Sequence, residues 1–305
     1  MKGISVIIPT YNREQFIAEA IESVINQEYI GDIEIVIADD GSTDRTLEIA
    51  QSYSDKVTIL RKSANCLTQG VSTTRNRGIK ASTQPYICFL DSDDFFLPGH
   101  LKKISVAIES KENLGFAFCR ILEIKEEEGS RLFKAWTKPS ITTKDIINPA
   151  VSGNNVVCSN VFIFQRYVFD TVGMFNETFK NGEDSDMWMR ISERYKGAFA
   201  DHFGAVRRKH EFYQLTSRPK RAIHKYYLKV YEEAIKRYYH LGLKNFFRIY
   251  RLRALVFKYK LSQLKFLSNF YEFYFKRKDN PNKKLNDWYE LSYFLTDRSV
   301  EHQYI

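Results

Sequence analysis

The chain has 305 residues, of which 44% are hydrophobic and 15% aromatic, and its formal charge is +9. This composition provides a core for one large or two smaller domains and excludes a disordered chain. No segment reaches the roughly 18–20 consecutive apolar residues of a membrane-spanning helix. Residues 1–9 also lack the apolar segment of a signal peptide, so we expect a cytoplasmic protein.

The cysteines and the charges divide the chain further. The four cysteines are scattered without a Cys-x-x-Cys pair, which disfavours a disulfide framework or a structural zinc site; Cys88 and Cys119 lie in apolar runs typical of core residues. Residues 205–285 contain 22 lysines and arginines but five acidic residues, whereas the rest of the chain contains 24 and 32. We therefore expect an acidic body and a basic tail with different roles.

The first hundred residues alternate between strand and helix patterns. Apolar, β-branched runs predict strands, and apolar residues at helical spacing predict the helices between them. The predicted strands are 4–8, 33–38, 57–60 and 85–90, and the predicted helices are 14–27, 43–53 and 71–81. This alternation predicts an α/β fold with a central, mostly parallel sheet and helices on both faces.

Beyond residue 98 the pattern is less regular. Residues 116–124 and 131–136 are predicted strands, and residues 184–195 are a predicted helix. From residue 219 to about 278 the sequence is basic, aromatic and helical in pattern.

Polar side chains follow three of the predicted strands directly. They are Thr-Tyr-Asn-Arg at 10–13, Asp-Asp-Gly-Ser at 39–42 and Asp-Ser-Asp-Asp at 91–94. Because the carboxyl ends of parallel strands meet at one edge of a sheet, where such sheets bind ligands, we expect these clusters to converge.

Each cluster has a functional and a purely structural interpretation. Three carboxylates at 91–94 repel one another unless a cation neutralises them, which favours Mg²⁺ or Mn²⁺; alternatively, Asp93 or Asp94 caps a helix that starts near Pro98. Asp39 and Asp40 could accept hydrogen bonds from a nucleotide base, or form a turn before a helix capped by Ser42 or Thr43.

Three later features have similar alternatives. Glu183 and Asp184 begin a predicted helix and could cap it, or one of them could serve as a general base. His210 follows a basic run and could contact a phosphate or metal, or belong to a solvated patch. Arg75 lies in a predicted helix, where surface charge is the simplest interpretation.

Taken together, these motifs resemble those of the family 2 glycosyltransferases, inverting enzymes with the GT-A fold, here of the bacterial cell-surface polysaccharide type. The resemblance rests on five motifs in order: the sequences at 6–13, 39–44, 70–78, 90–98 and 182–188. It covers about residues 1–215, the predicted catalytic domain, and leaves residues 216–305 as a basic, aromatic-rich helical extension.

The resemblance implies roles for individual residues. Asp184 matches the catalytic base, with Glu183 as the other candidate. Asp93 would be the main ligand of Mn²⁺ or Mg²⁺, with Asp91 and His210 close to it. The nucleotide-binding residues would be Pro9, Thr10, Tyr11, Arg13, Asp39, Asp40, Arg75, Asp91 and Ser92.

The implied reaction is transfer of a sugar from a nucleotide-sugar donor, with UDP expected, to a hydroxyl of a saccharide or lipid-linked saccharide by a metal-assisted single displacement. The alternative is a catalytically silent glycosyltransferase-like module that binds a glycan or anchors a partner at the membrane. The intact carboxylate pairs argue against silence, since an unused site has no need to hold repelling charges together.

The basic tail leaves two interpretations open. It contains 18 Phe and Tyr residues between positions 205 and 285, and those near 223–241 recur at helical spacing. Such a helix could pack its aromatic face on the protein, or attach peripherally to the anionic inner face of the cell membrane. No nucleic-acid-binding motif accompanies the charge, so we expect no nucleic-acid partner.

Overall fold

The computed structural model describes residues 1–62, 70–127, 130–135, 158–210 and 220–240, together with Arg253, Val256, Phe257 and Lys260. The chain forms two compact units, Met1–Tyr213 and Gln214–Ile305. Cys66, Trp136 and the tail beyond residue 260 lie outside the described residues.

The first part of the chain alternates strands and helices as predicted. The elements are β1 (Ile4–Thr10), α1 (Ile17–Ile25), β2 (Ile33–Asp39), α2 (Thr46–Gln51), β3 (Val57–Leu60), α3 (Val71–Ala81) and β4 (Tyr86–Phe89). α1 and α2 each begin three residues later than expected, because the residues before them form polar turns rather than helix.

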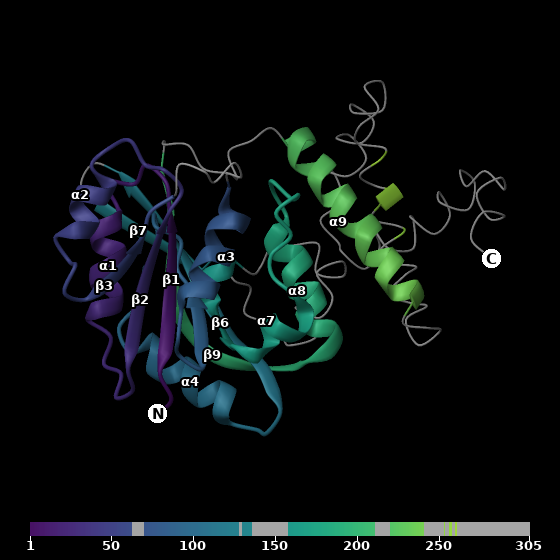
Figure 1. Cartoon of the computed structure of the whole chain (residues 1–305), viewed down its shortest axis with the longest axis horizontal. Helices are drawn as coiled ribbons and strands as arrows, with labels where there is room; N and C mark the ends of the chain where they lie inside the picture. Colours follow the sequence, from purple (N-terminus) through teal and green to yellow (C-terminus); the bar gives the residue numbers. More distant parts are fainter. Residues whose placement is uncertain are drawn as a thin grey trace. The chain divides into compact units, whose positions relative to one another are not determined.

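The four strands of this part are parallel and lie in the order β3-β2-β1-β4. Figure 1 shows α1 and α3 on opposite sides of β1 and β2, as right-handed crossovers in opposite directions require. The strand order therefore reverses between β1 and β4, the position at which open α/β sheets bind ligands.

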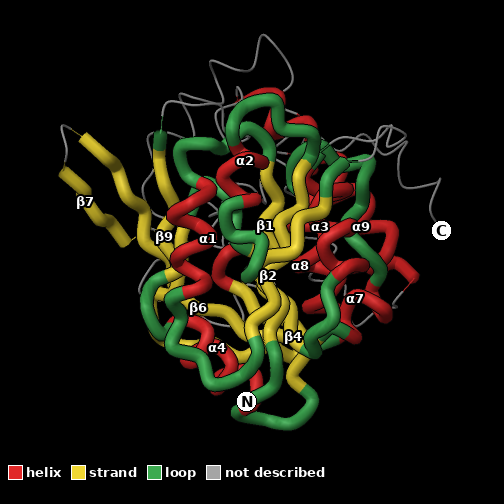
Figure 2. The backbone as a smooth tube through the Cα atoms, turned by 60° about the vertical axis from the view of Figure 1, so that its left-hand side comes forward, coloured by secondary structure: helices red, strands yellow, loops and turns green. Residues whose placement is uncertain are grey.

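The second part extends this sheet. Its elements are β5 (Phe95–Phe96), α4 (His100–Glu109), β6 (Leu114–Glu127), β7 (Ser130–Ala135), η1 (Ser159–Val161), β8 (Phe162–Gln165), α7 (Tyr167–Val172), α8 (Glu183–Arg194) and β9 (Lys196–Lys209). The sheet continues from β4 through β8, β6 and β9 to β5, and β7 pairs with β6 in a hairpin at one side (Figure 2). β8 pairs antiparallel with both neighbours, so the complete sheet is mixed.

Packing in the core holds α8, the helix that carries the predicted catalytic base, against the sheet. Every residue of β1 is buried, as expected for a strand with neighbours on both sides and helices on both faces. The rings of Phe162 and Phe164 lie 4.5 and 4.9 Å, centroid to centroid, from Trp188 of α8. Cys88 and Cys119 are buried in the same core, as predicted. This aromatic packing fixes α8 against the sheet.

The described part of the second unit consists mainly of α9 (Lys220–His240). Tyr227, Tyr231 and Tyr238 are buried along it, whereas Lys225 and Lys229 are exposed. The predicted amphipathic pattern is therefore confirmed for this helix. Among the described residues, no helix combines the length and apolar character needed to span a bilayer.

Candidate active site

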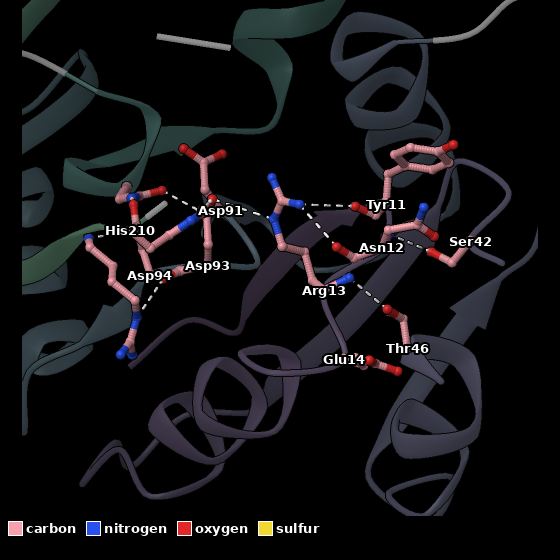
Figure 3. A network of polar contacts seen from close by, with 12 residues as sticks. Tyr11, Asn12, Arg13, Glu14, Ser42, Thr46, Asp91, Asp93, Asp94 and His210 are labelled. Carbon is pink, nitrogen blue, oxygen red and sulfur yellow. Dashed lines mark hydrogen bonds and ion pairs between the residues drawn. The ribbon is translucent and has the colours of Figure 1, made fainter. Parts of the chain in front are cut away.

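The loop after β4 forms a tight turn at the carboxyl edge of the sheet. The Asp94 amide donates to the Asp91 carbonyl at 3.0 Å, which closes the turn, and Ser92 and Asp94 are buried within it. Asp91 and Asp93 are partly exposed, and Figure 3 shows them near Arg13 and His210. The turn thus divides its acidic residues between the protein interior and the rim.

Asp94 is a buried anchor. Its Oδ1 accepts a hydrogen bond from the Arg208 amide at 2.7 Å, and its Oδ2 accepts one from Asn160 Nδ2 at 2.5 Å. Burial and the nearby carboxylates of Asp93 and Asp91 raise the pKa of Asp94 well above its ordinary value. The helix-capping interpretation is wrong, because α4 begins after Gly99 and has no side-chain cap.

Asp93 contacts two basic side chains. Its Oδ2 lies 3.1 Å from His210 Nε2 and 3.4 Å from Arg13 Nε. Burial opposes ionisation of Asp93, but the hydrogen bond to His210 and the charge of Arg13 outweigh it and lower the pKa. Phe16 stacks on the His210 ring at a centroid distance of 4.7 Å. His210 therefore belongs to the site rather than to a solvated basic patch.

These donor atoms fit a divalent cation. An ionised carboxylate oxygen and an imidazole nitrogen 3.1 Å apart can bind one ion, with further positions left for substrate phosphates and water. Asp91 is directed elsewhere, since its Oδ1 accepts a hydrogen bond from Arg75 at 2.9 Å. Of the three predicted ligands, the structure thus brings Asp93 and His210 together.

Arg75 lies beneath the rim and is buried, so its interpretation as surface charge is wrong. One terminal nitrogen donates to Glu183 Oε1 and the other to Asp91 Oδ1, both at 2.9 Å. The guanidinium also lies 5.5 Å from the Phe175 ring centroid. Burial disfavours the charge, but the carboxylates of Asp91 and Glu183 outweigh it and raise the pKa of Arg75.

The two acidic residues at the start of α8 have different surroundings. Gly182 precedes the helix with a φ of 78°, and no side chain caps it, so capping does not explain Glu183 and Asp184. Burial, followed by the Asp184 charge, raises the pKa of Glu183 to about 7 against the opposing effect of Arg75. Burial also raises the pKa of Asp184, and Arg75 again opposes the change. Glu183 is held by Arg75, whereas Asp184 Oδ1 accepts a hydrogen bond from the Ser185 amide at 2.6 Å.

The loop after β2 holds its two aspartates differently. Asp39 is buried, and its carboxylate accepts hydrogen bonds from the amides of Gly41 and Ser42 and from the Ser42 hydroxyl. Asp40 is partly exposed; its Oδ2 accepts a hydrogen bond from the Gly70 amide at 2.8 Å, and Lys62 Nζ lies 4.0 Å from Oδ1. Asp39 thus shapes the turn, and Asp40 is the more accessible carboxylate.

The loop after β1 is tied to the same turn. The Asn12 amide donates to Ser42 Oγ at 3.0 Å, and the Arg13 amide donates to Thr46 Oγ1 at 2.6 Å (Figure 3). Ser42 therefore links two loops, and neither it nor Thr43 caps α2, which has no side-chain cap. Just before this loop, Pro9 and Thr10 are buried and Tyr11 is half exposed. The Thr10 hydroxyl has no hydrogen-bond partner among the described residues.

Two residues of the site were absent from the sequence prediction. Asn160 is fully buried and bridges the Asp91 amide and the Asp94 carboxyl group. Arg208 supports the same turn from β9, since its amide reaches Asp94 and its Nε donates to the Asp93 carbonyl at 3.1 Å. Neither residue lies in a recognisable motif, and only the pairing of distant strands brings them to the turn.

Comparison with known protein families agrees with this arrangement. Residues 5–173, more than half of the chain, match the model of glycosyl transferase family 2. The chain belongs to this family. This membership agrees with the resemblance that the five motifs indicated.

Several curated proteins resemble this chain. An uncharacterized glycosyltransferase of Rickettsia felis is 32% identical over 195 residues, which span 62% of this chain and 31% of that protein. The uncharacterized glycosyltransferase EpsJ of Bacillus subtilis is 30% identical over 207 residues, with coverages of 63% and 58%. Chondroitin synthase of Escherichia coli is 28% identical over 190 residues, with coverages of 62% and 26%. The chain thus spans less than two thirds of the length of each of these relatives.

Solved structures share the fold of this chain. The structure of S. aureus TarS 1–349 in complex with UDP-GlcNAc has a TM-score of 0.63 and 22% identity, covering 92% of this chain and 77% of that one. The mannosyltransferase PcManGT from Pyrobaculum calidifontis, in complex with GDP-Man and Mn²⁺, has a TM-score of 0.54 and 16% identity, with coverages of 83% and 69%. The predicted GT-A fold is therefore confirmed.

Proposed function

We propose that the protein is an active glycosyltransferase that moves a sugar, with inversion, from a nucleotide-sugar donor to a hydroxyl of a saccharide or lipid-linked saccharide. The observation that carries this proposal is the set of acidic and basic side chains at the carboxyl edge of the sheet. Arg75 binds Glu183 and Asp91 and also influences the Asp184 carboxyl group, and Asp93 contacts His210 at the same edge. The transfer needs groups that bind an ionised diphosphate and a group that accepts a proton. This edge of the sheet offers both.

Asp184 is our candidate for the general base. An acceptor hydroxyl is a weak nucleophile at neutral pH, so a carboxylate must take its proton as the oxygen attacks the anomeric carbon. The bond to the nucleoside diphosphate breaks on the opposite face, which inverts the configuration in one displacement. Glu183 is less suited to this role, because Arg75 already binds its carboxylate at 2.9 Å. Glu183 instead positions Arg75.

The leaving diphosphate would lie beside Asp93 and His210. These residues would hold Mn²⁺ or Mg²⁺, and a bound divalent ion would stabilise the charge that develops on the diphosphate. Arg13 contributes a further positive charge at this position, because its Nε lies 3.4 Å from Asp93 Oδ2. The same residues would therefore bind the donor and promote departure of its nucleotide.

The nucleotide would occupy the loops after β1 and β2. Tyr11 offers a half-exposed ring, Thr10 a buried hydroxyl that lacks a described partner, and Asp40 a partly exposed carboxylate suited to a base N–H. Pro9, Asp39 and Ser92 are buried and would shape the pocket from behind. We favour uracil as the base, and the TarS structure in complex with UDP-GlcNAc supports a UDP-sugar as the first donor to test.

Two further proposals concern the organisation of the chain. Residues 1–215 would form the catalytic domain and residues 216–305 an extension with a separate role. α9 exposes Lys225, Lys229 and Lys236, so anionic headgroups on the inner face of the cell membrane are candidate ligands for it. Salt-sensitive sedimentation with anionic but not zwitterionic vesicles would support this proposal, and equal sedimentation with both would contradict it.

The test of the main proposal is a turnover and thermal-shift screen of UDP-, GDP- and dTDP-sugars, each with Mn²⁺, Mg²⁺ or EDTA. We expect metal-dependent stabilisation and slow release of nucleotide by hydrolysis with the preferred donor, because water can replace the acceptor. A folded protein that responds to no donor would instead support the silent module that binds glycans or anchors a partner.

A further inference from the structure

A second group of potential metal ligands lies apart from the acidic rim. His100 is the first residue of α4, Cys119 lies in β6 and His202 lies in β9. Their ligand atoms all lie within 4.8 Å of one another, and among the described residues no other set of three His, Cys, Asp or Glu side chains gathers in this way. We refer to these three residues as the His-Cys-His cluster.

We propose that the His-Cys-His cluster binds a zinc ion that fastens α4 to β6 and β9. Zinc prefers tetrahedral coordination, with bonds of about 2.0–2.1 Å to nitrogen and about 2.3 Å to sulfur, which places two nitrogens about 3.4 Å apart and a nitrogen and a sulfur about 3.6 Å apart. His100 Nδ1 lies 3.1 Å from His202 Nε2 and 3.9 Å from Cys119 Sγ. The third pair, Cys119 Sγ and the His202 nitrogen, lies within 4.8 Å, so shifts of about an ångström or less convert the cluster into a zinc site.

The imidazoles of the cluster are available as neutral ligands. Burial, together with the charge of Lys103, lowers the pKa of His202 to about 4, and burial lowers the pKa of His100 well below its ordinary value. Both rings are therefore uncharged at pH 7. His100 is 1% exposed, so an ion bound to its Nδ1 would lie in the protein interior.

Gly204 keeps room for the cluster. A Cβ atom at this position would lie 2.1 Å from His100 Nδ1 and 2.6 Å from Cys119 Sγ. The glycine is not among the residues with positive φ, so its backbone conformation does not require glycine, and the lack of a side chain serves the space beside the two ligand atoms. On its other side, His100 packs against the Phe96 ring at a centroid distance of 4.6 Å.

The ligand set selects the class of metal. Two imidazoles and one thiolate suit Zn²⁺, whereas Mg²⁺ and Mn²⁺ prefer oxygen ligands of the kind found at Asp93. His202 is partly exposed, which leaves a path for the ion and a fourth position for water. Binding would displace the proton of the Cys119 thiol. His210 follows His202 by eight positions, roughly 26 Å of extended chain along β9, so this site is distinct from the donor site.

The experiment uses the full chain after EDTA treatment and dialysis. Titration with Zn²⁺ against a colorimetric zinc indicator is expected to show one tightly bound ion per chain and a higher Tm. Substitution of Co²⁺ is expected to give the thiolate-to-cobalt charge-transfer band and the intense visible bands of a tetrahedral site. Absence of tight binding, or a cobalt spectrum without a thiolate band, would overturn the proposal.

Variants separate this site from other thiols and from the donor site. Cys119→Ala and His202→Gln are expected to weaken Zn²⁺ binding at least tenfold, and His202→Gln changes a partly exposed side chain that is not needed for the core. Cys88→Ala, which removes the other thiol buried in the sheet core, should keep both the affinity and the cobalt spectrum. Asp93→Asn should also keep them. A thiolate band that persists in Cys119→Ala would refute the assignment.

Discussion

Arg75 and Arg13 both serve the acidic rim, but the protein holds them in different ways. Arg75 is buried, and its two terminal nitrogens bind Glu183 and Asp91 at 2.9 Å. Arg13 is partly exposed; its Nη1 donates to the carbonyls of Tyr11 and Asn12, and its Nε contacts Asp93 at 3.4 Å. The first arginine is a fixed part of the core, whereas the second, in the proposed reaction, would exchange its carboxylate partner for a phosphate.

This difference divides the site into two halves. The Arg75 half orients the carboxyl groups next to the proposed base, and its geometry is set by packing against Phe89 and Phe175. The Arg13 half, with Asp93 and His210, would hold the diphosphate and metal ion of the proposed reaction. Substitutions in the first half should therefore affect stability and chemistry, and substitutions in the second should affect donor binding.

The largest effect is expected from Asp184→Asn, which removes the proposed base and keeps the shape of the side chain. The rate of sugar transfer should fall by about 10²–10⁴-fold, the usual contribution of a general base. The Kd for UDP, measured by calorimetry, should change little. Asp170→Asn, which alters an exposed carboxylate on α7, serves as the control and should keep full activity. Normal turnover by Asp184→Asn would move the base to Glu183.

The second-largest effect is expected on stability, from a substitution in the Arg75 half of the site. Arg75→Ala leaves the buried Glu183 carboxylate without its partner, and breaking such a pair typically costs about 3–5 kcal/mol of unfolding free energy. Chemical denaturation should show this loss, and Arg75→Lys should recover part of it by keeping the charge without the two-pronged geometry. Arg45→Ala removes an arginine from an exposed pair with Glu48 and should leave the denaturation midpoint unchanged. Equal losses of unfolding free energy in Arg75→Ala and Arg45→Ala would contradict the view that the Arg75 pair is a fixed part of the core.

The substitution Asp93→Asn tests the Arg13 half of the site. This change removes the ionised ligand, so donor binding in the presence of Mn²⁺ should weaken at least about tenfold, and the difference between Mn²⁺ and EDTA should largely disappear. Asp94→Asn is the matched control, because Asp94 faces Asn160 and the Arg208 amide instead of the rim. It should lower stability but keep the response to metal. Loss of the response in both variants would place the metal elsewhere.

The fold and the site were predictable from the sequence to different extents. The strands of the parallel half and the loops that follow them were found because each site residue there lies within a few positions of a strand end, as Tyr11 and Asp91 do. Asn160 and Arg208 were missed because their roles depend on how η1 and β9 pack against the loop after β4, which local patterns do not encode. The same limit applies to the His-Cys-His cluster, whose members lie in three separate elements.

The helix-capping errors have a related cause. Polar residues before a helix are interpreted locally as caps, but distant partners can bind them instead. Asp94 accepts hydrogen bonds from the Arg208 amide and Asn160. The Ser42 hydroxyl donates to Asp39 and accepts a hydrogen bond from the Asn12 amide. Where a carboxylate has a distant partner of this kind, sequence spacing identifies the residue as important but assigns it the wrong role.

The smallest expected effect is a pH dependence, and it reports on Glu183. Its pKa is raised to about 7, so as the pH falls through this value Glu183 takes up a proton and no longer balances the charge of Arg75. The unbalanced cation makes Asp184 a weaker base. The kcat should therefore decrease several-fold from pH 8 to pH 6 in the wild type, and it should be low and nearly independent of pH in Glu183→Gln, which resembles the protonated form throughout.

Stability provides an independent check with a defined sign. Because the pKa of Glu183 is raised on folding from its ordinary value of 4.5 to about 7, the folded protein holds a proton in this interval that the unfolded chain has lost. The unfolding free energy of the wild type, relative to Glu183→Gln, should therefore decrease as the pH rises from 4.5 to 7 and stay constant above 7. Denaturation curves of both proteins at pH 5, 6, 7 and 8 measure this difference. A constant difference across the series would mean that Arg75 keeps Glu183 ionised throughout, and the pH dependence of kcat would then belong to another group.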